Sequence, residues 1–417
     1  MNRILSVIAC FLILLVFADE AKAQVFNPTK GCVVDANGDC LPNTILGALP
    51  FLRIVPDAAA GAMGDTGIGT DNGVNALHFN ASKLPFMSKE RGLSFTYTPW
   101  LTNIGLTDVY LIYLSGFMKI DDLQSVGASV RFFSLGDITF TDAQGDPSGQ
   151  GQPREWEVAF GYTRKLANNF SAGLTAKYML SDLATGQTVE GINITTATSF
   201  AADLSFTYNN EVQVGLYDSR LRIGAAISNI GNKVTYTRNT TRDFIPTNFG
   251  LGAALEMDFD EFNTFSFALD INKLMIPTPI AQNIVTIENG VEVTSINPEY
   301  DPDGDGIAEY REKALFSGII ESWGDAPGGF SEELQEFNYS VGVEYWYDKQ
   351  FAVRAGYYFE NPLKGDRQFL TVGAGLKYNV FGFDISYLVP TSNTRNPLDN
   401  TLRFSLLFDF EVFQSDR

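Results

Sequence analysis

The sequence predicts an all-β protein, a transmembrane antiparallel β-barrel, and the first sign of this fold class is a strict alternation of residues. In the segment 401–411, apolar Leu402 and Phe404 flank Arg403, and the segments 367–379 and 381–389 alternate in the same way. A period of two is typical of strands, whose successive side chains point to opposite faces. One face is apolar, and the other carries Gly, Ser, Thr and single charges. This pattern fits a barrel with lipid outside and a polar interior.

A second observation, the aromatic content, helps to distinguish the membrane barrel from the main alternative fold, a soluble β-sandwich. A soluble β-sandwich also alternates, but it buries its apolar face inward. The chain contains 33 Phe, 17 Tyr and 4 Trp residues. Several of them, such as Trp100, Trp346 and Tyr387, fall at or near predicted strand ends, where the aromatic girdles of membrane barrels lie. The aromatic residues therefore favour the membrane barrel.

A third observation is an export signal at the N-terminus. Arg3 precedes an apolar stretch, residues 4–17, and Ala21 and Ala23 supply small residues at a cleavage site. Residues 1–23 are therefore predicted to be a signal peptide that is removed. The rest of the sequence has no apolar run of the roughly 18 residues that a membrane helix requires. Two locations are therefore possible for the exported protein, the periplasm and the outer membrane of a Gram-negative cell. The strand pattern favours the outer membrane.

Composition also restricts the function. The net charge of −20 and the pI of about 4.4 argue against nucleic acid as a partner. After removal of the signal peptide, a single histidine and two cysteines that are expected to pair provide little for a nucleophile and base pair. The acidic pair Asp121 and Asp122 is interpreted as a solvated turn. We therefore expect no enzymatic activity and no required cofactor.

Fourteen strands are predicted, an even number, although twelve or sixteen remain open. Their ranges are 93–100, 108–119, 124–137, 155–165, 169–181, 197–209, 219–229, 247–258, 262–272, 335–348, 350–360, 367–379, 381–389 and 401–411. Connections after even-numbered strands include very short ones, whereas those after odd-numbered strands include the long ones. Bacterial outer-membrane barrels have short periplasmic turns and long external loops. The predicted barrel domain is 93–417, and its longest external loop is 273–334.

Residues 24–92 do not alternate cleanly and are predicted to form a separate N-terminal segment that is periplasmic or plug-like. Within it, Cys32 and Cys40 are the two cysteines that remain after removal of the signal peptide. In an oxidising compartment we expect them to form a disulfide.

The loop 273–334 contains a pattern of possible calcium ligands. Acidic residues and a glycine stand at the spacing of a calcium-binding loop, with a main-chain ligand at the seventh position. The proposed ligands are Asp301, Asp303, Asp305, Ile307, Glu309 and Glu312, with Gly306 at the sixth position. A solvated acidic turn is the alternative, because no flanking helices are evident. Calcium would offset the repulsion between carboxylates and order the loop.

Several motifs together resemble the PorV family, the outer-membrane barrels of the type IX secretion system. They are 51–57, 62–67, 75–80, 97–101, 106–110, 133–138, 396–398 and 401–408, and they extend over nearly the whole chain after the signal peptide. One departure is Ala81, which follows Asn80 where the family usually has proline. The resemblance implies a FadL-like barrel of fourteen strands that performs no chemistry.

The resemblance also implies a function in secretion. Proteins of this family bind the C-terminal signal domain of cargo that leaves an SprA-type translocon. They carry it to a PorU-type sortase and attachment complex, which exchanges the signal for a lipopolysaccharide anchor. Because the long loops lie outside the cell, we expect them to bind cargo, with Phe316, Trp323 and Phe330 as candidate contacts.

Two other functions remain open. A FadL-like transporter of hydrophobic small molecules would use residues 24–92 as a hatch, and fold alone does not exclude it. Such a lumen should present an apolar inward face, yet the last five strands carry charges there. These inward residues are Glu344, Arg354, Lys377, Asp384, Arg403 and Asp409. They indicate a filled, structural interior. A purely structural barrel would leave the loop 273–334 without a function.

Overall fold

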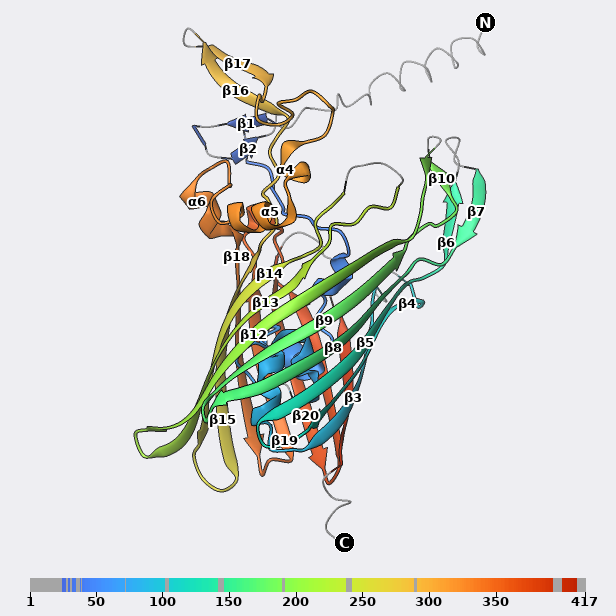
Figure 1. The fold of residues 1–417 in the computed structure, drawn as a ribbon. Coiled ribbons are helices and arrows are strands. Elements are labelled where there is room, and N and C mark those ends of the chain that lie inside the picture. Colours follow the sequence, from blue (N-terminus) through green and yellow to red (C-terminus); the bar gives the residue numbers. More distant parts are fainter. Residues whose placement is uncertain are drawn as a thin grey trace, which may run out of the picture.

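The central feature of the computed structural model is a closed barrel of fourteen antiparallel strands, which confirms the predicted fold class (Figure 1). The described residues are 25–410, apart from gaps at 28, 31, 35–37, 39, 72, 102–104, 142–145, 190–191, 238–241, 289–290 and 393–399. The predicted signal peptide and the motif 396–398 lie outside the described residues. The barrel closes where its last strand pairs with its first.

Each barrel strand corresponds to one predicted strand. They are β3 (Arg91–Pro99), β4 (Val109–Lys119), β5 (Gln124–Leu135), β8 (Arg154–Ala167), β9 (Phe170–Asp182), β12 (Ala197–Val214), β13 (Tyr217–Gly231), β14 (Asn248–Asp258), β15 (Asn263–Leu274), β18 (Phe337–Tyr347), β19 (Phe351–Phe359), β20 (Gln368–Tyr378), β21 (Phe381–Pro390) and β22 (Leu402–Asp409). The largest boundary difference is in the β12–β13 hairpin, which continues to a turn at Gly215 and Leu216. The polar residues Asn209 and Asn210 resemble a turn in sequence, but the ladder continues through them.

The two ends of the barrel differ in their connections. Six connections are turns of two to four residues, and they lie at the end of the barrel where β22 ends, which we call the turn end. The long connections lie at the opposite end, the loop end, as the alternation of connection lengths predicted. Two of them contain short hairpins, made by β6 (Ile138–Thr141) with β7 (Pro147–Gly151) and by β10 (Thr188–Val189) with β11 (Ile192–Asn193).

Side chains alternate across the barrel wall. In β8, Trp156, Val158 and Phe160 are exposed on the outer face, whereas Glu155 and Glu157 are buried inside. The outer face is the one that lipid covers in an outer-membrane barrel. None of the described helices has the length and apolar character to cross a membrane.

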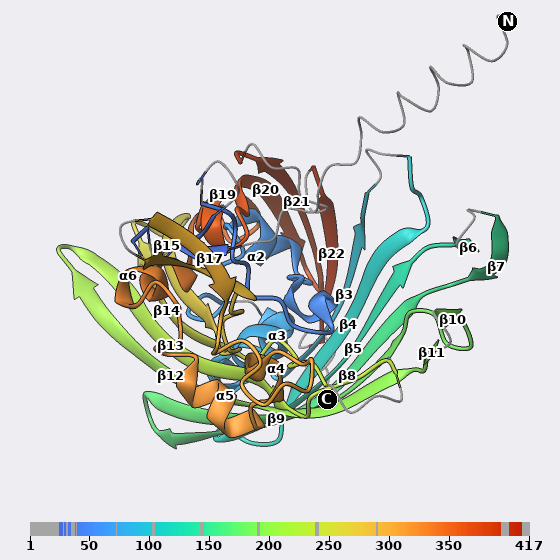
Figure 2. The same ribbon diagram turned by 90° about the horizontal axis from the view of Figure 1, so that it is seen from above.

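The N-terminal segment enters the barrel and forms a plug, which is seen inside the ring of strands in Figure 2. Its short helices are η1 (Pro50–Arg53), α2 (Ala58–Ala62), η2 (Gly73–Asn75), α3 (Ala76–Phe79) and η3 (Ala81–Phe86). Asp57 caps α2 by accepting hydrogen bonds from the amides of Ala59 and Ala60. Gly64 allows the plug to approach the wall, because a Cβ there would lie 2.6 Å from the backbone of Tyr357.

A second, smaller sheet stands on the loop end. It contains β1 (Val25–Asn27), β2 (Cys32–Val34), β16 (Asn283–Glu288) and β17 (Val291–Ile296), in the order β17-β16-β1-β2. The β15–β18 connection also contains α4 (Glu309–Glu312), α5 (Leu315–Glu321), α6 (Phe330–Glu333) and η5 (Leu334–Glu336). The N-terminal segment thus has two parts, a strand pair at the loop end and a plug in the lumen. Cys32 and Cys40 are joined by a disulfide.

Candidate functional site at the loop end

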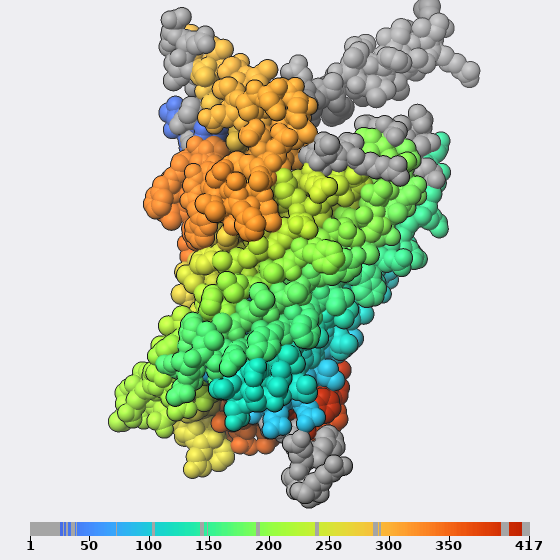
Figure 3. Space-filling view, in the orientation of Figure 1, coloured from blue at the N-terminus to red at the C-terminus, as the bar shows by residue number. Residues whose placement is uncertain are grey.

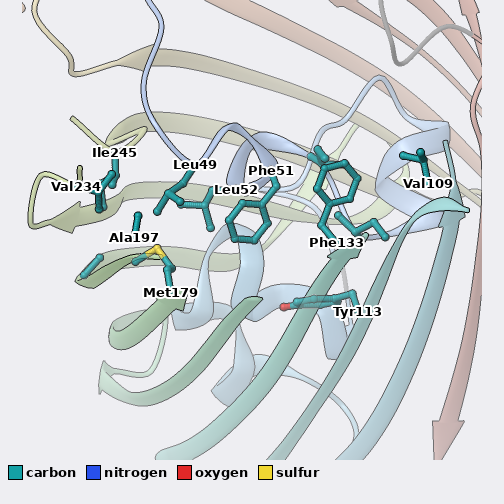
Figure 4. Close-up of a cluster of buried hydrophobic side chains, with 13 residues drawn as sticks. Leu49, Phe51, Leu52, Val109, Tyr113, Phe133, Met179, Ala197, Val234 and Ile245 are labelled. Carbon is teal, nitrogen blue, oxygen red and sulfur yellow. The ribbon is translucent and has the colours of Figure 1, made fainter. Parts of the chain in front are cut away.

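The barrel interior contains an apolar patch against which the plug packs (Figure 4). Its wall residues are Leu111 and Tyr113 of β4, Phe133 of β5 and Met179 of β9. The plug places Leu49, Phe51 and Leu52 against them, and each of these three side chains is at most 4% exposed. The sequence predicted inward charges from the last five strands and missed this patch, because it lies on other strands. The patch is part of the protein core.

Ion pairs and hydrogen bonds hold other parts of the interior. Arg354 lies 2.6 Å from both Glu344 and Asp384, and Arg403 lies 2.8 Å from Asp65 of the plug. These predicted inward residues therefore have structural partners. Lys377 differs from them, because it is exposed near the turn end of β20.

The plug is also anchored through its backbone. The carboxylate of Asp270 on β15 accepts hydrogen bonds from the amides of Gly67, at 2.6 Å, and Ile68, at 2.8 Å. Thr371 on β20 accepts one from the amide of Gly64. A lumen cavity of about 130 Å³ lies between plug and wall, lined mainly by polar and charged residues. This volume is below the roughly 300 Å³ of small ligand pockets.

A buried ion cluster fixes the long connection to the barrel rim. Lys273 of β15 is fully buried and pairs with Glu333 at 2.8 Å and with Glu336 at 2.5 Å. Lys364, in the short helix η6 (Pro362–Lys364), pairs with Glu336 at 3.0 Å and with Glu332. Removing one partner from such a cluster leaves a buried charge uncompensated. The connection is therefore held firmly on the rim.

The plug joins the loop end through a second cluster. Glu360, after β19, pairs with Arg367 at 2.7 Å and with Arg53 of η1 at 3.2 Å. Burial alone would raise the pKa of Glu360, but Arg367 and Arg53 outweigh burial and lower it. The carboxylate therefore stays ionised and connects the plug to the β19–β20 connection.

Helix α5 packs one side against the rim and exposes the other. Gly318 lies against Phe244 and Pro277, with 2.7 Å between a Cβ built on Gly318 and the Phe244 ring. Ile319 is buried on the same side. On the other side, Phe316 and Ile320 are 67% and 71% exposed, one helical turn apart.

The three predicted cargo contacts lie in the same connection but differ in their surroundings. Phe316 of α5 and Phe330 of α6 are largely exposed. Trp323 is partly exposed and packs against two aromatic residues at the barrel rim, Phe249 at 5.3 Å and Phe337 at 6.3 Å between ring centroids. Trp323 therefore also fastens the connection to the barrel.

Sequence reasoning missed other exposed apolar residues at the loop end. Ile320 follows Phe316 by four residues, so its helical spacing could have identified it. Leu46 is 77% exposed and belongs to the N-terminal segment. Its position at the loop end depends on how the chain enters the barrel, which no local pattern indicates. We call Leu46, Phe316, Ile320 and Phe330 the loop-end apolar residues.

The predicted calcium ligands are only partly brought together. Carboxylate oxygens of Asp301, Asp303 and Asp305 lie within 4.8 Å of one another. Asp301 accepts hydrogen bonds from the amides of Gly304 and Gly306, so its carboxylate also shapes the turn. The other three proposed ligands lie at or near helix α4. Ile307 precedes this helix, and Glu309 and Glu312 lie within it.

The electrostatics of this turn agree with a short distance between its acidic groups. Partial desolvation, with the nearby carboxylates of Asp305 and Asp303, raises the pKa of Glu312. Oxygen ligands of this kind suit Ca²⁺. A cation would offset the part of this pKa shift that comes from repulsion between carboxylates.

The fold and interior define a class of protein, an outer-membrane β-barrel with a plugged lumen and a firmly held assembly of loops at one end. Residues 37–281 match the family of type IX secretion system protein PorV. The match covers more than half of the chain, and the chain belongs to this family. No curated protein sequence matches it.

Solved structures of similar shape are outer-membrane barrels of low sequence identity. The toluene transporter TodX of Pseudomonas putida is 12% identical, with 86% of this chain and 99% of that chain covered and a TM-score of 0.47. The toluene transporter TbuX of Ralstonia pickettii is 12% identical, with 85% and 98% covered and a TM-score of 0.46. A FadL homologue of Pseudomonas aeruginosa is 9% identical, with 88% and 100% covered and a TM-score of 0.40.

Proposed function

We propose that this protein is a non-enzymatic cargo shuttle of type IX secretion. It binds the C-terminal signal domain of cargo leaving an SprA-type translocon, and it delivers that domain to a PorU-type sortase and attachment complex. Membership of the PorV family supports the pathway. The single observation that carries the binding step is the group of exposed apolar residues held on a firm base at the loop end.

The base matters because a binding surface loses less entropy when it is ordered before binding. Lys273 and Glu336 are both fully buried beneath the connection that presents Phe316 and Phe330. Aromatic residues that are exposed in the free protein and buried on binding often dominate interface energy. The loop end therefore has the properties of a prepared docking surface.

The runner-up, a FadL-like transporter of hydrophobic small molecules, has less support. Its binding region would be an apolar lumen, and Phe51 and Leu52 of the plug occupy the apolar patch in the interior. A deletion strain separates the two functions. Loss of cargo release and anchoring supports the shuttle, whereas normal secretion with lost uptake of long-chain apolar compounds supports the transporter.

The shuttle is tested by a double variant, Phe316→Ser with Phe330→Ser. We expect each substitution to weaken binding of a purified cargo signal domain by about tenfold, because an exposed aromatic contact is lost. Leu216→Ser is the matched control, since Leu216 is 93% exposed at the turn end. Interferometry with the protein in lipid nanodiscs measures the affinity. Equal affinities for the double variant and the control would contradict the proposed docking surface.

A further inference from the structure

The small sheet at the loop end has one edge that the chain itself covers and one edge that is free. At the β2 edge the chain returns on itself: the amide of Leu41 donates to the carbonyl of Val33 at 2.6 Å, and Val34 forms a bridge with Cys40. The disulfide between Cys32 and Cys40 holds this return in place. At the other edge, β17 pairs with β16 and with no other strand among the described residues.

The register shows which backbone groups of β17 are directed outward. The amide of Asn297 donates to Gln282, and the hydroxyl of Thr286 donates to the carbonyl of Val293. Odd-numbered residues of β17 therefore bond to β16, because bonding alternates along an antiparallel ladder. The N–H and C=O groups of the even-numbered residues Glu292, Thr294 and Ile296 point away from the sheet.

β17 has only one of the features that protect a free edge, the charged residue Glu292. Its six residues include no proline, lysine or arginine, and its pairing with β16 contains no bulge. Proteins normally block a free edge with such features. Val291 is 63% exposed and Ile296 75% exposed, so the strand is also partly apolar. Figure 1 shows β17 as the strand of this sheet that lies farthest from the barrel.

The charge around the free edge of β17 restricts the charge of a strand that could pair with it. Residues 275–336, which include β17, contain thirteen acidic and two basic residues. The space-filling view shows this connection covering one side of the loop end (Figure 3). A partner strand flanked by lysine or arginine would be attracted to this region. A second copy of the same acidic connection would be repelled.

We propose that β17 binds an extended strand of the cargo signal domain by edge pairing, which adds a fifth strand to the sheet. This inference rests on the proposed shuttle function and specifies its mode of binding. Main-chain hydrogen bonds would provide affinity without requiring one cargo sequence. The loop-end apolar residues would contact the body of the same domain, and basic residues beside the added strand would face the acidic connection.

The decisive variant is Thr294→Pro, which removes an outward N–H that β16 does not use and is tolerated at a sheet edge. The matched control Thr294→Ala removes the side chain and keeps the N–H. With a purified cargo signal domain as the probe, we expect Thr294→Pro to weaken binding by at least about tenfold and Thr294→Ala by less than about twofold.

Hydrogen exchange of the wild-type protein in nanodiscs provides a second measurement. On addition of the cargo signal domain, the amides of Glu292, Thr294 and Ile296 should exchange more slowly, because they become bonded. If wild type and Thr294→Pro bind equally and these amides remain unprotected, edge pairing is overturned while the shuttle function stands. If wild type does not bind the signal domain, both proposals fail. A dimer that Thr294→Pro abolishes would identify a second copy as the occupant and overturn this inference.

Discussion

Two apolar surfaces among the described residues, one inside the barrel and one at the loop end, differ in what covers them. The inner patch on β4, β5 and β9 is covered by the plug residues Leu49, Phe51 and Leu52, each at most 4% exposed. The outer surface, with Phe316 and Phe330, has no such cover among the described residues and is more than 60% exposed at both positions. The connection that carries the outer surface is fixed by the buried ion pair of Lys273 with Glu336.

The comparison assigns the lumen to the stability of the fold, and it agrees with the proposal that the loop end binds a partner. An apolar surface covered by the same chain contributes to folding, because its burial removes it from water. An exposed apolar surface on an ordered base costs solubility unless a partner covers it. The loss of one phenyl ring should therefore lower the stability of the protein at the inner patch and leave it nearly unchanged at the outer surface.

The largest expected effect is at the inner patch. Phe51→Ala should lower the free energy of unfolding by about 3–5 kcal/mol, because a large buried side chain is lost and a cavity remains. Equilibrium urea unfolding in lipid vesicles measures the change. The matched variant is Phe330→Ala, which should change stability by less than about 0.5 kcal/mol because its ring is 78% exposed. Equal losses for both variants would break the comparison.

The sequence predicted the wall far better than the interior. All fourteen strands were predicted because a period of two is a local signal that lipid on one side imposes on each strand. The filling of the inner patch by Phe51 depends on contacts with strands far along the chain. The pairing of Val25 with Asn283 and the ion pair of Lys273 with Glu336 likewise join distant segments.

The candidate site was also predicted only in part, because contacts between distant segments are not visible in the sequence. Exposed aromatic residues in a long external loop were visible in the sequence, and Phe316 and Phe330 are exposed in the structure. The packing of Trp323 on Phe249 was not visible, because it joins the β15–β18 connection to strand β14, which is distant in the sequence. The free edge and the closed edge of the small sheet could not be predicted either, since the sheet joins two segments far apart in the sequence, residues 25–34 and 283–296.

An intermediate effect is expected from the disulfide that closes the β2 edge. Replacing Cys32 and Cys40 by serine should destabilise the β1–β2 part of the sheet by about 2.5 kcal/mol, because a short loop is released in the open state. Hydrogen exchange should then quicken at the amides of Val33 and Leu41 and stay unchanged in the barrel strands. Unchanged exchange at Val33 would show that packing, and not the disulfide, holds this edge closed.

The smallest expected effect concerns calcium, which we propose binds at Asp301, Asp303 and Asp305. Their oxygens lie within 4.8 Å of one another, and a cation would relieve the carboxylate repulsion that, together with desolvation, raises the pKa of Glu312. Calorimetric titration should give a dissociation constant of about 10⁻⁴ to 10⁻³ M, as in extracellular calcium modules. At ten times this concentration, calcium should stabilise the turn by about 1.4 kcal/mol.

The double variant Asp303→Asn with Asp305→Asn should abolish the heat of calcium binding, whereas Glu321→Gln, on α5, should retain it. Absence of wild-type heat at millimolar calcium would leave these residues as an acidic turn, and the exposed surface of the loop end would then depend on its buried ion pairs alone.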